Sequence, residues 1–585
     1  MSARLKQKTL TQIEEWLNNK FLHRDISELV VYLAVFCYTL IFSYFTIAKF
    51  NSFSTYAWDL GIFDQSLWTT LHSGKFLFNT VEMFISQPGT PLYGSFFVIH
   101  FSPILFLVLP FYWLNSSPQT LLVFQSFILG VAAVPLYFFA KNTLNNRVTA
   151  VVFSLAYLLY PPLQGVNWFD FHVQAFLPLF FFCTFYFLAK EEWLQYFVFI
   201  FLSLMVAENV PVTVVFVGLY GFWRFRKQFL DMIKIRKFDV KLAIPILTVV
   251  IAVLWLFFSS WVKQTYFPFN SDFAPLYRAV AHWPFLGKTD DPIKLPLYLI
   301  TNSGGAFAAL SYDFWLKILY LFLLFAPLVF LSLRSSITLI SLAWLVPAVF
   351  SNYTPYYTIG GHFPAYPVAF IFLGAVEALS KNPQPVHLSN FIRWTKRLPS
   401  ASALFRVFIS PLNLKRWTKR ILIVSVLFTV FISPLSPVML EAQNIFQSFA
   451  DYHLPIMNIH DELLQATVEL VPNNASILTQ NNIFTHFSSQ LNAYVYPLPL
   501  IIETCNDTEK ARTDLQVHIE TLFAASEYVL VDDATDSYIA SAVLLRKEIL
   551  NFGLFAYGDG IHLYLKNYSG RILFLSSRTR FSGTI

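Results

Sequence analysis

Long apolar stretches recur along most of this 585-residue chain, in which 56% of the residues are hydrophobic. A helix that crosses the hydrocarbon core of a bilayer needs roughly 20 apolar residues, with about 17 as a lower limit. The first such stretch runs from about Leu29 to Ala48. Only 13% of the residues are charged, whereas a soluble globular protein carries about 25%. The sequence therefore predicts a polytopic α-helical membrane protein.

Ten further apolar segments are read as transmembrane helices, which makes about eleven with the first. They run approximately over Thr120–Ala140, Thr149–Leu163, Val173–Ala189, Trp193–Ala207, Pro211–Trp223, Leu242–Trp261, Phe314–Leu333, Ile337–Phe350, Pro364–Leu379 and Ile421–Val438. Phe101–Leu114 is also apolar, but it is only 14 residues long and contains Pro103 and Pro110. We expect this segment to form an interfacial or re-entrant helix instead of a span.

The distribution of Lys and Arg predicts the orientation, because the cytoplasmic loops of membrane proteins carry an excess of these residues. We take residues 1–28 as a cytoplasmic N-terminus and residues 29–440 as a transmembrane domain. Of the Lys and Arg residues in these two parts together, 25 then lie on the cytoplasmic side and 7 on the external side. The loops that follow are external at 51–119, 263–313 and 351–363, and cytoplasmic at 380–420. The predicted location is the plasma membrane.

The composition changes at about Glu441. From there onward 8 basic and 16 acidic residues occur, against 32 and 18 before it. The segments Ala475–Thr479 and Tyr528–Asp533 alternate with polar helical segments, and Phe555–Lys566 is typical of a hairpin around Gly558-Asp559-Gly560. We expect residues 441–585 to form a soluble, extracytoplasmic α/β domain.

Polar side chains of chemical interest fall at the predicted external ends of different apolar segments. An acid in a tight turn between two spans is costly if it faces lipid, which favours a functional role. We expect these side chains to converge just above the bilayer. They are Asp59, Asp64, His100, Asp170, His172, Glu208, Tyr356, Tyr357 and His362.

The order of these motifs resembles a known group of predicted membrane proteins. An Asp-containing first external loop, then His100-Phe101-Ser102-Pro103, then Asp170-Phe171-His172 is similar to the pattern of domain of unknown function 2079. The resemblance covers nearly the whole chain and includes Thr485-His486-Phe487. That group is similar in layout to the GT-C class of glycosyltransferases. The chain departs from it at Ala207-Glu208-Asn209, where the group tends to show Lys-Glu-Asp, which argues against a role that needs a second acid beside Glu208.

The GT-C resemblance implies a polyprenyl-phosphate sugar donor, an external active site and an essential Asp in the first external loop. Sugar transfer to a hydroxyl needs a base close to the acceptor. Asp59 or Asp64 could be this base. Asp59 is preferred because it follows Trp58 and is the first acid after the first span. In the alternative interpretation Asp59 only caps an interfacial helix, since Asp is a good N-cap residue.

The remaining candidates are expected to bind the donor. His100, Asp170, His172 and Glu208 could contact it directly or through a divalent cation such as Mg or Mn, with Asp64, Asp170 and His172 as possible metal ligands. No cofactor is predicted firmly. Tyr356, Tyr357 and His362 could line the sugar site, or the tyrosines could belong to an aromatic belt at the membrane interface.

The leading hypothesis is therefore a GT-C-type transferase that moves a sugar from a polyprenyl-phosphate donor to a lipid or surface acceptor. One alternative is a non-catalytic membrane scaffold with an external binding domain. Another is a lipid or solute transporter, although the sequence has no visible repeat and its acids lie at span ends instead of mid-span. Nucleic acid is not an expected partner, because the basic residues lie in short loops between spans. The oligomeric state is left open.

Overall fold

The structure is a computed structural model that describes residues 26–235, 240–270, 283, 295–380, 413–441, 452–453, 455–497, 509–535 and 551–575. Most of the predicted cytoplasmic N-terminus and most of the predicted loop at 380–420 lie outside the described residues. So does most of 271–294, within the predicted external loop at 263–313.

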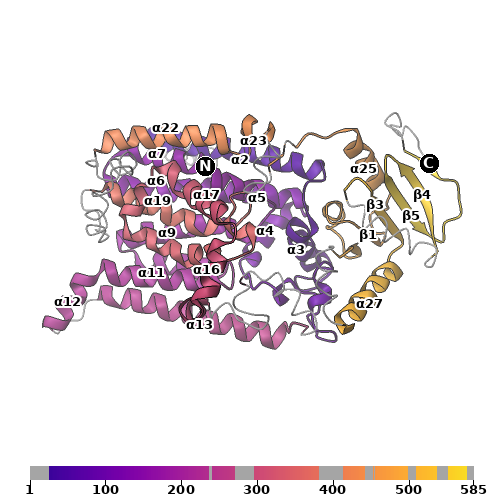
Figure 1. The fold of residues 1–585 in the computed structure, drawn as a ribbon, viewed down its shortest axis with the longest axis horizontal. Coiled ribbons are helices and arrows are strands. Elements are labelled where there is room, and N and C mark those ends of the chain that lie inside the picture. The colour runs from indigo at the N-terminus through magenta and orange to yellow at the C-terminus, as the bar shows by residue number, and fades with distance from the viewer. Residues whose placement is uncertain are drawn as a thin grey trace, which may run out of the picture.

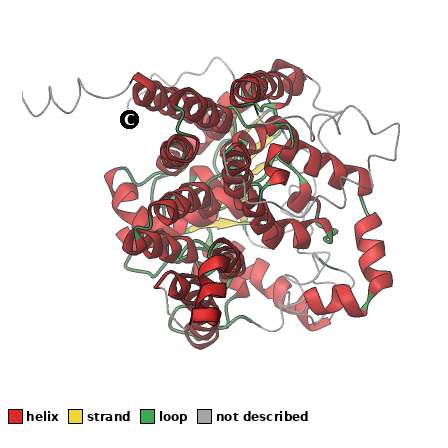
Figure 2. Ribbon diagram, turned by 90° about the vertical axis from the view of Figure 1, so that its left-hand side faces the viewer, coloured by secondary structure: helices red, strands yellow, loops and turns green. Residues whose placement is uncertain are grey.

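A bundle of helices forms one end of the molecule and a β-sheet the other (Figure 1). Seen along the bundle, many of its helices run roughly in the direction of view, with strands behind them (Figure 2). Among the described residues, five helical segments are long and apolar enough to cross a membrane. They are Ile26–Asn51, Pro118–Leu144, Val173–Lys190, Ala243–Tyr266 and Leu414–Met439. Two bent pairs, Arg147–Leu158 with Pro161–Trp168 and Ser303–Ser311 with Phe314–Leu328, raise the number to seven. The chain is thus a helical membrane protein with five to seven candidate spans.

The main helices of the bundle carry the labels of Figure 1. They are α2 (Ile26–Asn51), α5 (Pro118–Val131), α6 (Ala133–Leu144), α7 (Arg147–Leu158), α8 (Pro161–Trp168), α9 (Leu177–Lys190), α10 (Trp193–Leu204), α11 (Val210–Arg224), α12 (Arg226–Ile235), α13 (Ala243–Tyr266), α15 (Leu295–Thr301), α16 (Ser303–Ser311), α17 (Phe314–Phe325), α18 (Leu342–Val349), α19 (Ala365–Leu379), α22 (Leu414–Ile432) and α23 (Pro437–Glu441).

Several of the eleven predicted spans correspond to shorter apolar helices. Among them are α10, α11 and α19, each of 10 to 17 residues. Helix α19 is buried along its whole length. Its Gly374 faces Thr338 so closely that an added Cβ would lie 2.1 Å from the Thr338 hydroxyl oxygen. Glycine therefore lets α19 sit at the centre of the bundle. In the predicted non-spanning segment, α4 (Leu105–Leu114) is ten residues long.

The segment between α2 and α4 lies between the bundle and the sheet, where Figure 1 shows α3 (Ile62–His72). One π-helical turn, Ala57–Gly61, leads directly into α3. The neighbouring stretch contains two short 3-10 turns, Met83–Ile85 and Phe96–Val98. This segment carries the first two acids predicted to be functional.

The C-terminal region forms a six-stranded mixed sheet of order β2-β1-β3-β5-β4-β6. The strands are β1 (Ile477–Thr479), β2 (Ala493–Val495), β3 (Tyr528–Asp532), β4 (Phe552–Gly558), β5 (Ile561–Lys566) and β6 (Leu573–Phe574), and the helices are α25 (Ile459–Glu469) and α27 (Glu509–Ala525). Strand β1 pairs in parallel with both β2 and β3, and β4 pairs antiparallel with β5. The predicted mixed α/β region and its hairpin are therefore confirmed.

Candidate functional site

Asp59 lies in the π-helical turn that precedes α3. Its Oδ1 is 3.4 Å from Nε2 of His172, and the Asp59 side chain is 25% exposed. The other ring nitrogen, Nδ1 of His172, lies 3.0 Å from the main-chain oxygen of Asp170. Because a carbonyl oxygen only accepts, Nδ1 is the donor in this contact, and Nε2 faces Asp59, with which it pairs when it also carries a proton. Single π-helical turns are often found at functional sites, and this one presents a reachable carboxylate paired with an imidazole.

Asp170 is buried and braces the segment that carries Asp59. Its Oδ2 accepts a hydrogen bond from the backbone N–H of Tyr56 at 2.7 Å, and its Oδ1 lies 3.9 Å from Nζ of Lys49. Lys49 also donates to the carbonyl oxygen of Trp168 at 2.8 Å, at the C-terminal end of α8, where a cation is favoured. Burial raises the pKa of Asp170 to about 6, opposed by Lys49 and reinforced by Asp59.

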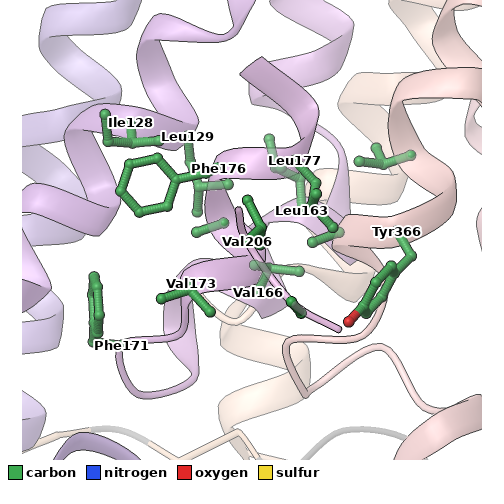
Figure 3. Close-up of a cluster of buried hydrophobic side chains, with 14 of the residues drawn as sticks. Ile128, Leu129, Leu163, Val166, Phe171, Val173, Phe176, Leu177, Val206 and Tyr366 are labelled. Atoms are coloured by element: carbon green, nitrogen blue, oxygen red, sulfur yellow. The ribbon is translucent and has the colours of Figure 1, made fainter. Parts of the chain in front are cut away.

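The turn from Asp170 to His172 is held by one buried amide and one buried ring. Gln125 in α5 donates to the carbonyl oxygens of Val166 and Phe169, each at 3.2 Å, and accepts the N–H of His172 at 2.8 Å. Phe171 is fully buried, and Figure 3 shows it at the edge of an apolar cluster. The cluster also includes Ile128, Leu129, Leu163, Val166, Val173, Phe176, Leu177, Val206 and Tyr366. This packing fixes the backbone on both sides of Phe171, where Asp170 and His172 lie.

His362 joins the same group from a loop before α19. Its ring is stacked on that of His172, with centroids 3.9 Å apart and planes 10° apart. The loop can approach α8 because residue 165 is glycine: an added Cβ there would lie 1.8 Å from the carbonyl oxygen of Ile359. Burial lowers the pKa of His362 well below its usual value, and His172 and His100 lower it further. The ring of His362 is therefore neutral at pH 7.

Glu208, between α10 and α11, forms a second group with two basic side chains. Its Oε1 is 3.5 Å from Nδ1 of His100 and 3.7 Å from Nζ of Lys263, and its Oε2 accepts from the N–H of Phe101 at 3.1 Å. Burial alone would raise the pKa of Glu208, but Lys263 and His100 outweigh it and lower this pKa to about 2. A carboxylate that stays ionised thus holds Lys263 and His100 in place.

Two tyrosines connect these groups. The rings of Tyr353 and Tyr356 have centroids 5.1 Å apart. Burial raises the pKa of Tyr353, and the charge of Asp59 adds to the rise. Burial also raises the pKa of Tyr356, with a smaller contribution from Glu208. Asp59 thus acts electrostatically on one ring of this aromatic pair and Glu208 on the other, although the two acids are far apart in the sequence.

Tyr357 contacts other residues than Tyr353 and Tyr356 do. Its hydroxyl donates to Oδ2 of Asp313 at 2.9 Å, and Nζ of Lys317 lies 4.8 Å from the centre of its ring. Its ring is fully buried. The role in substrate binding predicted for Tyr357 remains a prediction, and its polar group is already bonded to Asp313.

The partners of Asp64 differ from those of Asp59. Its Oδ1 accepts from the hydroxyl of Tyr112 at 2.5 Å, and its Oδ2 accepts from Ser488 at 2.7 Å and Ser489 at 2.9 Å. The residue is completely buried, and burial raises the pKa of Asp64 to about 6 against these three hydrogen bonds. These contacts are those of a structural carboxylate that joins α3 to α4 and to the C-terminal region.

The predicted metal ligands Asp64, Asp170 and His172 are not assembled as one ligand set. Within the part of the chain that the structure describes, no group of three or more His, Cys, Asp or Glu side chains is placed to hold a metal ion. The physical reason lies in their partners: three hydroxyls surround Asp64, and Asp170 faces Lys49 and the N–H of Tyr56. The donor atoms present there do not fit a three-ligand site.

Some buried polar atoms on the segments that form the site lack a hydrogen-bond partner among the described residues. They include the indole Nε1 of Trp58, Oδ1 of Asn352 and Nδ1 of His362. Buried polar groups in proteins are nearly always bonded to protein or water. Trp58 adjoins Asp59, and His362 is stacked on His172. These atoms leave hydrogen-bonding capacity for water or a polar ligand.

Sequence reasoning missed Lys49 and Lys263 as members of the site. Both lie at the end of an apolar helix, where a lysine ordinarily extends its amine toward the membrane surface. Lys49 is 5% exposed, however, and Lys263 reaches back to the carbonyl oxygen of Ile99 at 2.5 Å. The sequence pattern that could have identified them is a lysine at the same predicted membrane face as several acids.

The sequence matches the family model "Predicted membrane protein (DUF2079)" over residues 49–560. The chain belongs to this family. It is thus a multi-pass membrane protein of the DUF2079 family, as its motifs suggested. No match to a curated protein was found. Among solved structures, this family member is similar to the archaeal oligosaccharyltransferase AglB from Archaeoglobus fulgidus, in complex with an inhibitory peptide and a dolichol-phosphate. That similarity has a TM-score of 0.37 and 13% identity, and covers 94% of this chain and 74% of the other.

Proposed function

We propose that the protein is a membrane glycosyltransferase of GT-C type, which transfers a sugar from a polyprenyl-phosphate donor to a hydroxyl of a lipid or surface acceptor. The pairing of Asp59 with His172 supports this most directly. It places a partly exposed carboxylate, held by an imidazole, at the ends of several helices. A general base for a hydroxyl needs this combination of access and fixed position.

In this proposal Asp59 is the catalytic base. Its carboxylate takes the proton from the acceptor hydroxyl as the acceptor oxygen forms a bond to the anomeric carbon of the sugar. The bond from that carbon to the phosphate oxygen breaks, and the polyprenyl phosphate leaves with the bonding electron pair. His172 is a positioning residue that fixes the carboxylate 3.4 Å from its Nε2. The balance of atoms and charge needs no further reactant.

The leaving phosphate gains negative charge as its bond to the sugar breaks, so positive side chains close to it would lower the barrier. Lys263 and His100 are suited to this role. Both are partly exposed, at 24% and 45% of the side chain, and Glu208 holds them together. They also lie at the end of α13 and just before α4, near the apolar surface where a polyprenyl chain would dissolve.

The proposed orientation places this site at the external membrane face, with the N-terminus in the cytoplasm and the C-terminal region outside. Transport is less well supported, because transporters usually bind their substrate near the bilayer midplane. Asp59, Asp170 and Glu208 instead lie between helices or just before one. A pure scaffold would not require the ionised and neutral groups around Asp59 to be held so closely.

The test uses the full-length protein in lipid nanodiscs with a panel of polyprenyl-phosphate-linked hexoses and short-chain lipid acceptors. Release of polyprenyl phosphate, followed by mass spectrometry, should occur with at least one donor. Asp59→Asn should lower the rate by about 10²- to 10⁴-fold, the range for loss of a general base, with an unchanged melting temperature. Release that is equal in the wild type and in Asp59→Asn, or absent with every donor, would contradict the proposal.

A further inference from the structure

The π-helical turn that carries Asp59 has no capping side chain of its own. Tyr56, which occupies the N-cap position, makes no side-chain hydrogen bond to the turn. The first N–H groups of any helix lack acceptors within that helix. The N–H groups of Ala57 and Trp58 therefore need acceptors from another part of the chain.

Those acceptors come from Asn481, in the loop that follows strand β1 of the C-terminal sheet. Its side-chain Oδ1 accepts from the N–H of Ala57 at 3.0 Å and of Trp58 at 3.4 Å. Its main-chain oxygen also accepts from the N–H of Ala57, at 2.8 Å. An Asn side chain is one of the preferred N-caps of helices. Here the cap comes from a residue 424 positions later in the chain.

The loop that carries Asn481 is fixed against the segment just before the turn. The ring of His486 lies between those of Phe50 and Phe53, with centroids 4.2 and 4.0 Å away. The hydroxyls of Thr485 and Thr55 are 2.9 Å apart. Stacked rings and a hydroxyl pair thus anchor the loop on the chain that leads from α2 into the turn.

The same loop is also fixed against the segment just after the turn. The ring of Phe484 lies so close to Gly61 that an added Cβ would be 2.7 Å from it. Further along, Ser488 and Ser489 bond to Asp64, and Gln65 donates to the main-chain oxygen of Gln490 at 3.0 Å. The turn that holds Asp59 is therefore clamped on both sides by residues 481–490.

We propose that Asn481 is a positioning residue for Asp59, so that the C-terminal α/β region completes the site on the helical bundle. The carboxamide of Asn481 sets the start of the turn, and the start of the turn sets the direction in which Asp59 points toward the acceptor. The catalytic aspect of this inference rests on the proposed function. The physical aspect, a helix cap supplied by a distant residue of the same chain, rests on the contacts alone.

Hydrogen–deuterium exchange of the full-length protein in nanodiscs tests the physical aspect. Asn481→Ala should raise the exchange rate of the Trp58 amide by roughly fivefold, the change expected for loss of an N-cap. The Ala57 amide should change less, because the main-chain oxygen of residue 481 still accepts from it at 2.8 Å. Asn481→Asp keeps an oxygen acceptor and should restore the protection. Asn458→Ala is the matched control, because Asn458 caps α25 through the N–H of Asp461 at 3.0 Å. It should raise exchange in α25 only.

Unchanged exchange at Trp58 in Asn481→Ala would overturn the inference. The catalytic aspect is read from the release of polyprenyl phosphate. Asn481→Ala should lower kcat at least tenfold with an unchanged KM for the donor, and Asn458→Ala should leave both unchanged. A role of Asn481 in stability alone would leave kcat of the folded fraction unchanged. If Asn481→Ala raises the exchange of the turn but the wild type releases no polyprenyl phosphate, the proposed function fails. The capping of the turn by Asn481 would still stand.

Discussion

The imidazole of His172 contacts Asp59 through its edge, with Nε2 3.4 Å from the carboxylate, and stacks its face on the ring of His362, with centroids 3.9 Å apart. A ring held in this way has little freedom to rotate. The loop before α19 therefore restricts the orientation of the proposed base through His172, although this loop makes no bond to Asp59 among the contacts described.

The first prediction concerns His172. His172→Gln removes the ring that fixes Asp59 and should lower kcat for sugar transfer by about 100-fold, as expected when a reacting group is displaced by about 1 Å. KM for the donor should change little, because His172 is not assigned to phosphate binding. Steady-state release of polyprenyl phosphate measures both constants. A rise in KM with an unchanged kcat would instead assign His172 to donor binding.

A second prediction separates the two acids of the first external segment. Asp64→Ala leaves the hydroxyls of Tyr112, Ser488 and Ser489 without their shared acceptor, and should lower the free energy of unfolding by about 2–4 kcal/mol. Asp59→Ala should lower it by less than about 1 kcal/mol, because Asp59 is partly exposed. Thermal unfolding in nanodiscs compares the two variants. Equal stabilities would contradict the structural role of Asp64.

The contrast between these two acids also shows which site residues can be predicted from the sequence and which cannot. Asp59 and His172 could be selected from the sequence because each stands at the end of an apolar segment. The role of Asp64 could not, since two of its three partners are serines in a loop more than 400 residues later. Ordinary serines give no signal of that kind.

Like the site residues, the secondary structure could be predicted only in part from the sequence. The hairpin of β4 and β5 follows from Gly558-Asp559-Gly560, because these residues suit a tight turn. Strands β1 and β2 are only three residues long, so their pairing comes from tertiary contacts. The number of spans is also hard to read from sequence, because apolar helices such as α10 and α19 are shorter than a bilayer, and α19 is buried inside the bundle.

The third prediction is a pH dependence at the junction of the two regions. Burial lowers the pKa of His486 to about 4, against 6.5 in an unfolded chain. The unfolded state therefore binds the proton first as pH falls, and the free energy of unfolding should decrease by about 2 kcal/mol per such group between pH 6.5 and 5. Burial lowers the pKa of His518 to about 4 as well, so both histidines contribute.

The variant His486→Phe keeps an aromatic ring between Phe50 and Phe53 but cannot be protonated. Relative to the wild type, it should therefore gain about 2 kcal/mol of stability between pH 6.5 and 5, and His486→Phe combined with His518→Phe about twice as much. The comparison with the wild type removes the opposite contribution of Asp64 and Asp170, whose pKa burial raises to about 6. Melting temperatures in nanodiscs across this pH range provide the measurement. A difference in stability between the wild type and His486→Phe that does not change from pH 6.5 to 5 would refute the assignment.

The fourth prediction concerns orientation. Lys141, at the end of α6, pairs with Glu28 at the start of α2 at 2.9 Å, so this end of the bundle is opposite to the one that carries Lys49 and the candidate site. In a variant without native cysteines, an impermeant thiol reagent applied outside should label Gln87→Cys and miss Asn145→Cys. Both positions are exposed in the structure. The reverse pattern would place the site in the cytoplasm.

The hydrogen bonds between Asp64 and the serine pair also have a consequence for biosynthesis. The ribosome releases the first external segment long before it makes Ser488, which lies 424 residues later. During this interval the nascent chain has a carboxylate that lacks two of its final partners. Maturation of this segment therefore waits until the loop that carries the two serines has been made, and a polypeptide terminated before that loop would present quality-control proteases with an unfinished surface.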